Sequence, residues 1–141
     1  MPKLRFDRRY AALAVAVALT ELAIACFVRD DFVRPYVGDT LAVILLYAAV
    51  LAVLDRPRAP VALFALAVAC AIELGQALRL WARLGLEDNT VARVVLGTFY
   101  DPRDLLAYAA ALPVIALYER LNHTPAASPA HNARTTRARC R

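Results

Sequence analysis

Four acidic residues lie within or beside long apolar stretches of this 141-residue chain, where a carboxylate needs a specific reason to be present. Glu21 and Glu73 interrupt apolar stretches, whereas Asp39 and Asp104 stand near the beginning of two others. A charged side chain at the centre of a membrane helix costs on the order of 3 kcal/mol, so such residues are functional candidates by default. Carboxylates in this setting could bind amine or hydroxyl groups of a ligand, or could take up protons.

Polar residues near Glu73 extend this candidate site. Gln76 follows Glu73 by three residues and therefore shares its face of a helix. An amide beside a carboxylate can donate as well as accept hydrogen bonds. The candidate arginine partners, which could also hold a phosphate group in a bidentate manner, are Arg34, Arg93 and Arg103. We expect Glu73, Gln76 and Arg93 to form one connected site.

A structural interpretation of the same residues stays open. Polar side chains in membrane helices often link neighbouring helices through hydrogen bonds, which could account for Glu21, Glu73 and Gln76. Asp39 could serve a helix terminus. The segment 101–104 reads as a helix start, since it combines an N-cap Asp, a Pro at the first helical position and an acid in the first turn. The argument for function is that all four acids are expected at a similar depth of the membrane.

The elements that would position these residues are four apolar blocks with charges mostly between them. Hydrophobic residues make up 61% of the chain, and the mean hydropathy is +0.50. A helix of about 20 residues spans about 30 Å, the thickness of the hydrocarbon core. The blocks predict membrane-spanning helices over residues 10–28, 35–54, 60–81 and 105–121. The predicted fold class is therefore all-α: a polytopic membrane protein built as a four-helix transmembrane bundle.

Two segments lie outside the predicted spans. The linker 82–103 is long, and its part 91–100 is mostly apolar but contains Arg93. It predicts an interfacial helix or a re-entrant segment between the third and fourth spans. Residues 122–141 are rich in Ala, Pro, Ser, Thr and Arg and can bury little apolar surface, which predicts a disordered basic tail. Residues 1–121 would form a single membrane domain.

Basic residues predict the orientation. With the N-terminus inside, the inner side would hold Lys3, Arg5, Arg8, Arg9, Arg56, Arg58, Arg120, Arg134, Arg137, Arg139 and Arg141. The outer side would hold Arg29, Arg34, Arg79, Arg83, Arg93 and Arg103. Because Lys and Arg are enriched in cytoplasmic loops, this bias favours a bacterial inner-membrane protein with both termini in the cytoplasm. The four acidic candidates would then lie toward the outer leaflet.

Several kinds of chemistry find no support in the sequence. The net charge of +5 does not indicate nucleic acid binding, because basic residues that flank apolar blocks set topology and attract anionic lipid. Cys26, Cys70 and Cys140 have no metal-binding spacing, and no histidine lies in a predicted span. The chain lacks a phosphate-binding glycine loop, a zinc motif and a serine nucleophile motif. We therefore expect no metal and no cofactor.

Short motifs along the chain carry a family resemblance. They are Arg34-Pro35-Tyr36-Val37-Gly38-Asp39, Glu73-Leu74-Gly75-Gln76, Gly85-Leu86-Glu87-Asp88-Asn89, Ala92-Arg93, Leu96-Gly97-Thr98 and Asp104-Leu105-Leu106-Ala107-Tyr108. In this order they resemble the bacterial membrane family called domain of unknown function 2809, over residues 5–120. That family has no established activity, so the resemblance supports the candidate site and the topology and leaves the reaction open.

A second resemblance is more distant. The Glu-x-x-Gln motif, a later Arg and the Asp that opens the last helix are similar to the VanZ-like family, which includes a teicoplanin-resistance protein of the cell envelope. Tyr108 and Ala111 depart from that pattern, which tends to have Asn and Gly at these positions. A shared ligand would be an envelope component.

The residues and resemblances together predict an inner-membrane protein whose outward-facing polar site binds a lipid headgroup or a cell-envelope precursor. Three alternatives stay open. One is an enzyme acting on lipid-linked substrates with Glu73 as acid or base, which no nucleophile motif supports. Another is a proton-coupled carrier that uses Glu21 and Glu73, for which four helices are few unless the chain forms a homodimer. The last is a structural or assembly subunit of a larger membrane complex.

Overall fold

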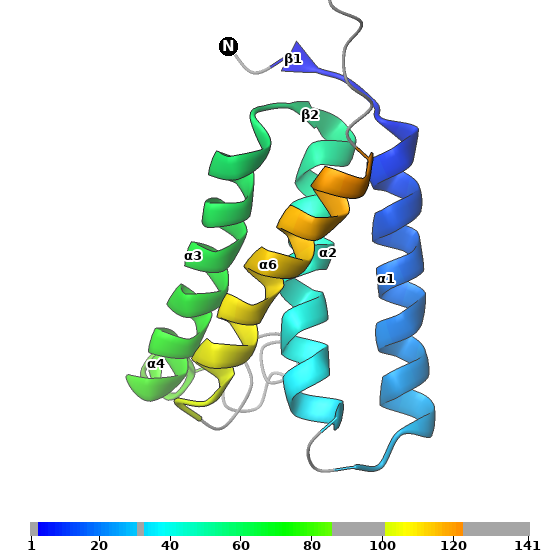
Figure 1. Cartoon of the computed structure of the whole chain (residues 1–141). Helices are drawn as coiled ribbons and strands as arrows, with labels where there is room; N and C mark the ends of the chain where they lie inside the picture. Colours follow the sequence, from blue (N-terminus) through cyan, green and yellow to red (C-terminus); the bar gives the residue numbers. More distant parts are fainter. Residues whose placement is uncertain (1–2, 31–32, 86–100, 123–141) are drawn as a thin grey trace, which may run out of the picture.

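The protein is mostly helical. The computed structural model describes residues 3–30, 33–85 and 101–122. Four long helices dominate this part of the chain: α1 (Arg8–Phe27), α2 (Gly38–Val53), α3 (Arg58–Ala77) and α6 (Asp104–Asn122) (Figure 1). A π-helical turn, η1 (Val33–Val37), leads into α2, and a short helix, α4 (Leu80–Arg83), follows α3.

Three of the long helices could cross a membrane. The segments Arg8–Phe27, Arg34–Val53 and Arg58–Ala77 each have 20 residues and mean hydropathies of 2.0, 2.0 and 1.7. Helices of that length extend about 30 Å. Helix α6 has 19 residues but is not among them, because Asp104, Glu119 and Arg120 add charge near its two ends. The expected helical fold with membrane-like helices is confirmed, whereas the fourth crossing stays a prediction.

Helix α2 is the centre of the bundle. It contacts α1, α3 and α6, and α3 also packs against α6 (Figure 1). The core contains the bulky Val43 and Tyr47 from α2 together with three alanines that are 0% exposed, Ala48, Ala65 and Ala111. Small residues at these positions let helix backbones approach closely. The large apolar residues left exposed are typical of helices that face lipid acyl chains.

A short strand pair, which the all-α prediction did not include, closes one end of the bundle. Strand β1 (Lys3–Leu4) pairs antiparallel with β2 (Leu54–Asp55), and Lys3 lies opposite Asp55. The contact continues as the Arg5 amide donates to the Val53 carbonyl at 3.1 Å. Backbone groups in the turn after α2 need partners, and the N-terminal segment supplies them. The side chain of Asp7 then caps α1 by accepting from the Arg9 amide at 2.9 Å.

The third predicted span, 60–81, is covered by two helices. Helix α3 ends at Ala77, and α4 begins at Leu80. Between them Arg79 adopts a φ of 49°, an uncommon backbone conformation for a residue other than glycine, which interrupts the helix. The predicted interfacial or re-entrant segment and the predicted disordered tail fall on residues 86–100 and 123–141, which lie outside the described residues.

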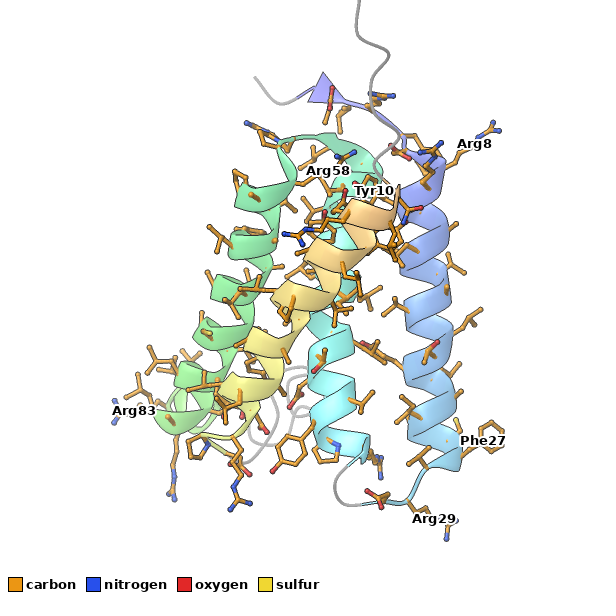
Figure 2. All side chains as sticks on the ribbon, in the orientation of Figure 1. Arg8, Tyr10, Phe27, Arg29, Arg58 and Arg83 are labelled. Atoms are coloured by element: carbon orange, nitrogen blue, oxygen red, sulfur yellow. The ribbon has the colours of Figure 1, made fainter. Side chains whose placement is uncertain are left out.

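The two ends of the bundle differ in what they hold. One end carries the start of α1, the strand pair and the end of α6, with Arg8, Tyr10 and Arg58 (Figures 1 and 2). The other end carries the end of α1, helix α4 and the start of α6, with Arg29 and Arg83. Each long helix runs antiparallel to the long helix before it in the chain, so their starts alternate between the two ends (Figure 1).

Candidate functional site

The side chain of Glu73 is buried to 1% exposure near the end of α3, and no other charged side chain is buried in the described part of the chain. Its two carboxylate oxygens have separate partners. The backbone amide of Asp101 donates to Oε1 at 3.0 Å, and the Tyr108 hydroxyl donates to Oε2 at 3.3 Å. Both donors belong to the beginning of α6 or the residues just before it. Glu73 therefore joins the end of α3 to the start of α6.

Two further carboxyl groups meet beside Glu73. Asp39 in the first turn of α2 and Asp104 in the first turn of α6 lie close enough for their side chains to interact. Glu73 is close enough to interact electrostatically with both. No salt bridge reaches any of these three carboxyl groups within the described residues.

The segment before α6 behaves as a helix cap. The Asp101 side chain accepts from the Arg103 amide at 2.9 Å, and the Asp101 carbonyl accepts from the Asp104 amide at 3.0 Å. The Asp101 side chain thus makes the hydrogen bond expected of a cap, whereas α6 itself begins at Asp104 and not at the expected Pro102. The same turn presents the Asp101 amide to Glu73. We call Asp39, Glu73, Asp101, Asp104 and Tyr108 the acid cluster.

A groove flanks the acid cluster between the beginnings of α2 and α6. Its volume is about 600 Å³, and it is lined by Tyr36, Val37, Thr40, Arg103, Leu106, Ala107 and Ala110. The exposed guanidinium of Arg103 donates a hydrogen bond to the Tyr36 hydroxyl, and this bond raises the pKa of Arg103. The Thr40 hydroxyl lies 2.9 Å from the carbonyls of both Tyr36 and Ala107, which joins the two helices. The groove thus combines a polar entrance with apolar walls.

No hydrogen bond or salt bridge within the described residues joins the remaining predicted site residues to the cluster. Glu21 lies half-buried on α1, and its Oε1 is buried without a hydrogen-bond partner in the described part of the chain. Gln76 is half-buried one turn after Glu73, and Arg34 is exposed. Arg93 lies outside the described residues, so the expected connection of Glu73, Gln76 and Arg93 stays a prediction.

A second polar network, which the sequence analysis did not predict, lies at the opposite end of the bundle. Both Tyr10 and Tyr47 donate from their hydroxyls to Glu119 Oε1 at 2.7 Å. Arg58 Nε donates to the Tyr10 hydroxyl and lies 2.8 Å from Glu119 Oε2. The rings of Tyr10 and Tyr47 meet edge to face, with centroids 6.1 Å apart. We call these four residues the tyrosine network; it joins α1, α2, α3 and α6.

One signal in the sequence could have indicated the tyrosine network. Glu119 stands in the last turn of α6, where the helix dipole disfavours a negative charge. An acid at that position needs a compensating donor, which Arg58 and the two tyrosine hydroxyls provide. The tyrosines themselves gave no signal, because a tyrosine in an apolar helix is usual at a membrane interface.

The fold and the cluster define a small helical protein with three helices long and apolar enough to cross a membrane and a buried carboxylate site at one end. Comparison with known families is consistent with this class. The chain belongs to the family described as protein of unknown function (DUF2809), whose model matches residues 28–111. The resemblance found in the motifs is thereby confirmed. No curated protein and no solved structure matches the chain.

The family match covers the two polar sites to different extents. It contains every member of the acid cluster, from Asp39 to Tyr108. It contains only half of the tyrosine network, because Tyr10 and Glu119 lie on either side of it. The comparisons do not link the chain to the VanZ-like family, so that resemblance enters only as a proposal.

Proposed function

We propose that the protein resides in the bacterial inner membrane and binds the headgroup of an amphiphile beside the acid cluster. The observation that carries this proposal is the groove of about 600 Å³ between α2 and α6. Arg103 and Tyr36 supply polar groups at its entrance, while Leu106 and Ala110 supply an apolar wall. Lipids and lipid-linked envelope precursors have this division between a polar head and an apolar chain.

The chemistry of the flanking residues favours a phosphate-bearing headgroup. A guanidinium can hold a phosphate through two parallel hydrogen bonds. Asp39 and Asp104, each of which lies between two groove residues in the sequence, would accept from a hydroxyl or amine of the same headgroup. The VanZ-like resemblance of Glu73, Gln76 and Asp104 supports an envelope component as the ligand.

The proposal includes a topology of four crossings with both termini cytoplasmic and the acid cluster toward the outside. Support comes from the basic residues Lys3, Arg5, Arg8, Arg9, Arg56, Arg58 and Arg120, which belong to the end of the bundle with the strand pair. Reporter fusions after Arg58 and Arg141 should then read cytoplasmic, and a fusion after Leu86 should read external. A cytoplasmic signal after Leu86 would refute the outward-facing site.

Binding is tested with the full-length protein in detergent, using a short-chain polyisoprenyl phosphate and a short-chain phospholipid as probes. Replacing Arg103 by Gln should weaken binding about tenfold, because a hydrogen bond to a charged group is lost. The matched control is Arg83→Gln, which removes the same charge from an exposed position at the end of α4 and should leave the affinity unchanged. Equal affinities of the wild type and Arg103→Gln would refute this site.

A proton-coupled carrier is a second candidate, favoured by the close approach of the Asp39 and Asp104 side chains. Carboxyl groups that share a proton inside a membrane are typical of proton relays. Vesicles containing the wild type would then show proton flux when a gradient is applied, and vesicles with Asp104→Asn would not. Absence of flux above that of empty vesicles would exclude this candidate and leave headgroup binding intact.

A further inference from the structure

The N-terminal segment folds back along the end of the bundle instead of extending away from it. The Asp7 amide donates to the Ala52 carbonyl at 2.9 Å, and the Arg5 amide donates to the Val53 carbonyl at 3.1 Å. Both acceptors belong to the last turn of α2, which is part of a candidate membrane span. Residues 5–7 therefore lie level with the end of that span, just before the first residue of α1.

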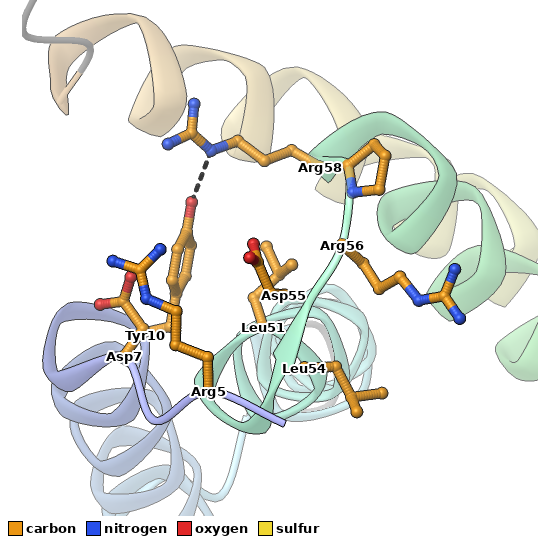
Figure 3. Close-up of a pocket in the computed structure, with 9 residues that line it drawn as sticks. Arg5, Asp7, Tyr10, Leu51, Leu54, Asp55, Arg56 and Arg58 are labelled. Atoms are coloured by element: carbon orange, nitrogen blue, oxygen red, sulfur yellow. Dashed lines mark hydrogen bonds between the residues drawn. The ribbon is translucent and has the colours of Figure 1, made fainter. Parts of the chain in front are cut away.

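The side chains of this segment alternate between two sides. Successive residues of an extended chain point to opposite sides, and hydrogen bonds from every second amide show that the segment is extended. Figure 3 shows the side chain of Arg5 directed toward Asp7 and Tyr10, into a polar pocket of about 360 Å³. Leu4 and Phe6 flank Arg5 in the sequence and therefore point to the other side.

The polar side of the segment is balanced in charge. The charged residues that line the pocket are Arg5, Arg56, Arg58, Asp7 and Asp55. Glu119 forms a salt bridge with Arg58 and supplies the third negative charge. The polar side thus gives no preference for an anionic ligand, and the feature of this end that lacks a counterpart is its apolar side.

That apolar side carries large exposed side chains. Leu4 is 83% exposed and Phe6 is 68% exposed. A single exposed apolar residue is usual on a protein surface. Here the backbone hydrogen bonds hold two of them where the hydrocarbon core of a bilayer ends, because a 20-residue span such as Arg8–Phe27 extends about 30 Å. Phe and Leu side chains at this depth insert into the boundary between lipid headgroups and acyl chains.

We propose that residues 3–7 form an interfacial anchor, in which Leu4 and Phe6 insert into the lipid leaflet at this end of the bundle while Arg5 remains over the polar pocket. The partner is the lipid surface and not one particular headgroup, because the inserted side chains are apolar. The anchor is bonded to the end of α2 and continues into α1, so it holds both helices at one depth. It requires that α1 and α2 cross the membrane, and it is independent of the headgroup site beside the acid cluster.

The test measures the depth of spin labels on the full-length protein in vesicles of phosphatidylethanolamine and phosphatidylglycerol. Leu4→Cys, Arg5→Cys and Phe6→Cys each provide one labelling site in a chain whose three native cysteines are replaced by Ala. All three positions are exposed, so the bundle can accommodate the labels. Collisions with oxygen, which concentrates in the bilayer, and with a water-soluble nickel complex report the depth. Labels at residues 4 and 6 should lie about 5–10 Å inside the leaflet, and the label at residue 5 should collide mainly with nickel.

The matched control is Arg56→Cys, because Arg56 is exposed in the turn between α2 and α3 at the same end. Its label should collide with nickel as freely as the label at residue 5. A label that entered the bilayer through its own affinity would do so at all four positions, so the alternation along residues 4–6 distinguishes the anchor. Equal nickel accessibility at residues 4, 5 and 6 would overturn the proposal. Labels at residues 4 and 6 that are shielded from both oxygen and nickel would also overturn it, and would indicate a protein partner or a second copy.

Discussion

The acid cluster and the tyrosine network solve the problem of a carboxylate in an apolar bundle in opposite ways. Glu119 is compensated: it faces Arg58 and accepts from two tyrosine hydroxyls. Glu73 is buried more completely and accepts from one backbone amide and one hydroxyl, with two more carboxyl groups nearby. No arginine forms a salt bridge with this cluster within the described residues. Compensated charge is typical of a structural bond, whereas uncompensated acidity is typical of a site that binds a proton or a ligand.

The extent of the family match agrees with this division. The model of the family ends between Tyr108 and Glu119, so the acid cluster lies wholly within it and the tyrosine network does not. A site inside the matched segment is the better candidate for a function common to the family. The tyrosine network would then be the means by which this chain fastens its first and last helices.

The largest effect is expected from removing the compensated carboxylate. Glu119→Ala leaves Arg58 and two tyrosine hydroxyls without their acceptor and should lower the free energy of unfolding by about 3 kcal/mol. Denaturant titration in detergent, followed by helical circular dichroism, measures the loss. Glu119→Gln keeps one acceptor oxygen and should lose less. An unchanged midpoint for Glu119→Ala would show that the network does not stabilise the bundle.

A smaller effect on stability is expected at the acid cluster. In Glu73→Gln the side-chain amide oxygen can still accept from the Asp101 backbone amide, and the Tyr108 hydroxyl can accept from the new side-chain amide N–H. The free energy of unfolding should change by less than about 1 kcal/mol, while headgroup binding falls. The same denaturant titration measures the change in the free energy of unfolding. A loss as large as that of Glu119→Ala would mean that both carboxylates are structural, and the contrast between the two ends would disappear.

Arg93 provides a further test of the difference between the paired Glu119 and Glu73. If Arg93 approaches the cluster, Glu73→Gln and Arg93→Gln should be coupled by about 0.5 kcal/mol or more in a double-mutant cycle on stability or ligand binding. Coupling in stability alone would indicate a salt bridge like that of Glu119. Coupling in binding would indicate a shared ligand site. Additive effects on both measurements would show that the two residues do not meet.

The smallest effect is expected from the basic tail, which follows the end of α6 beside the tyrosine network. Truncation before Pro125 should leave the melting temperature in detergent unchanged, because the composition of the removed residues is that of a segment unable to form a core. An unchanged melting temperature would show that the tyrosine network, and not the tail, stabilises that end of the bundle. A melting temperature lower by several degrees would show that the tail also stabilises that end.

Much of the helical arrangement was predictable because its signal is local. Apolar blocks separated by charges predict helices near those observed, and the capping segment 101–104 predicts where the last one begins. The meeting of Asp39, Glu73 and Asp104 was also foreseeable in outline. Two acids in the first turns of helices and one near the end of an antiparallel helix come to the same end of a bundle.

The partners of those acids were not predictable in the same way. Whether Glu73 faces Tyr108 depends on how α3 and α6 are rotated about their axes. Small residues such as Ala65 and Ala111 allow the close packing of the helices that brings the two side chains together. The pairing of β1 with β2 joins residues about fifty positions apart and has no local pattern. The tyrosine network requires side chains from four helices at once.

The sequence by itself determined which segments are apolar enough to enter a membrane and which residues are too polar to lie there without cause. Both properties belong to individual residues and their neighbours along the chain, since transfer free energy is a local quantity. Only the tertiary structure decided which carboxylate is compensated and which is not. That distinction depends on distances of about 3 Å between groups far apart in sequence, and such distances exist only after the helices have packed.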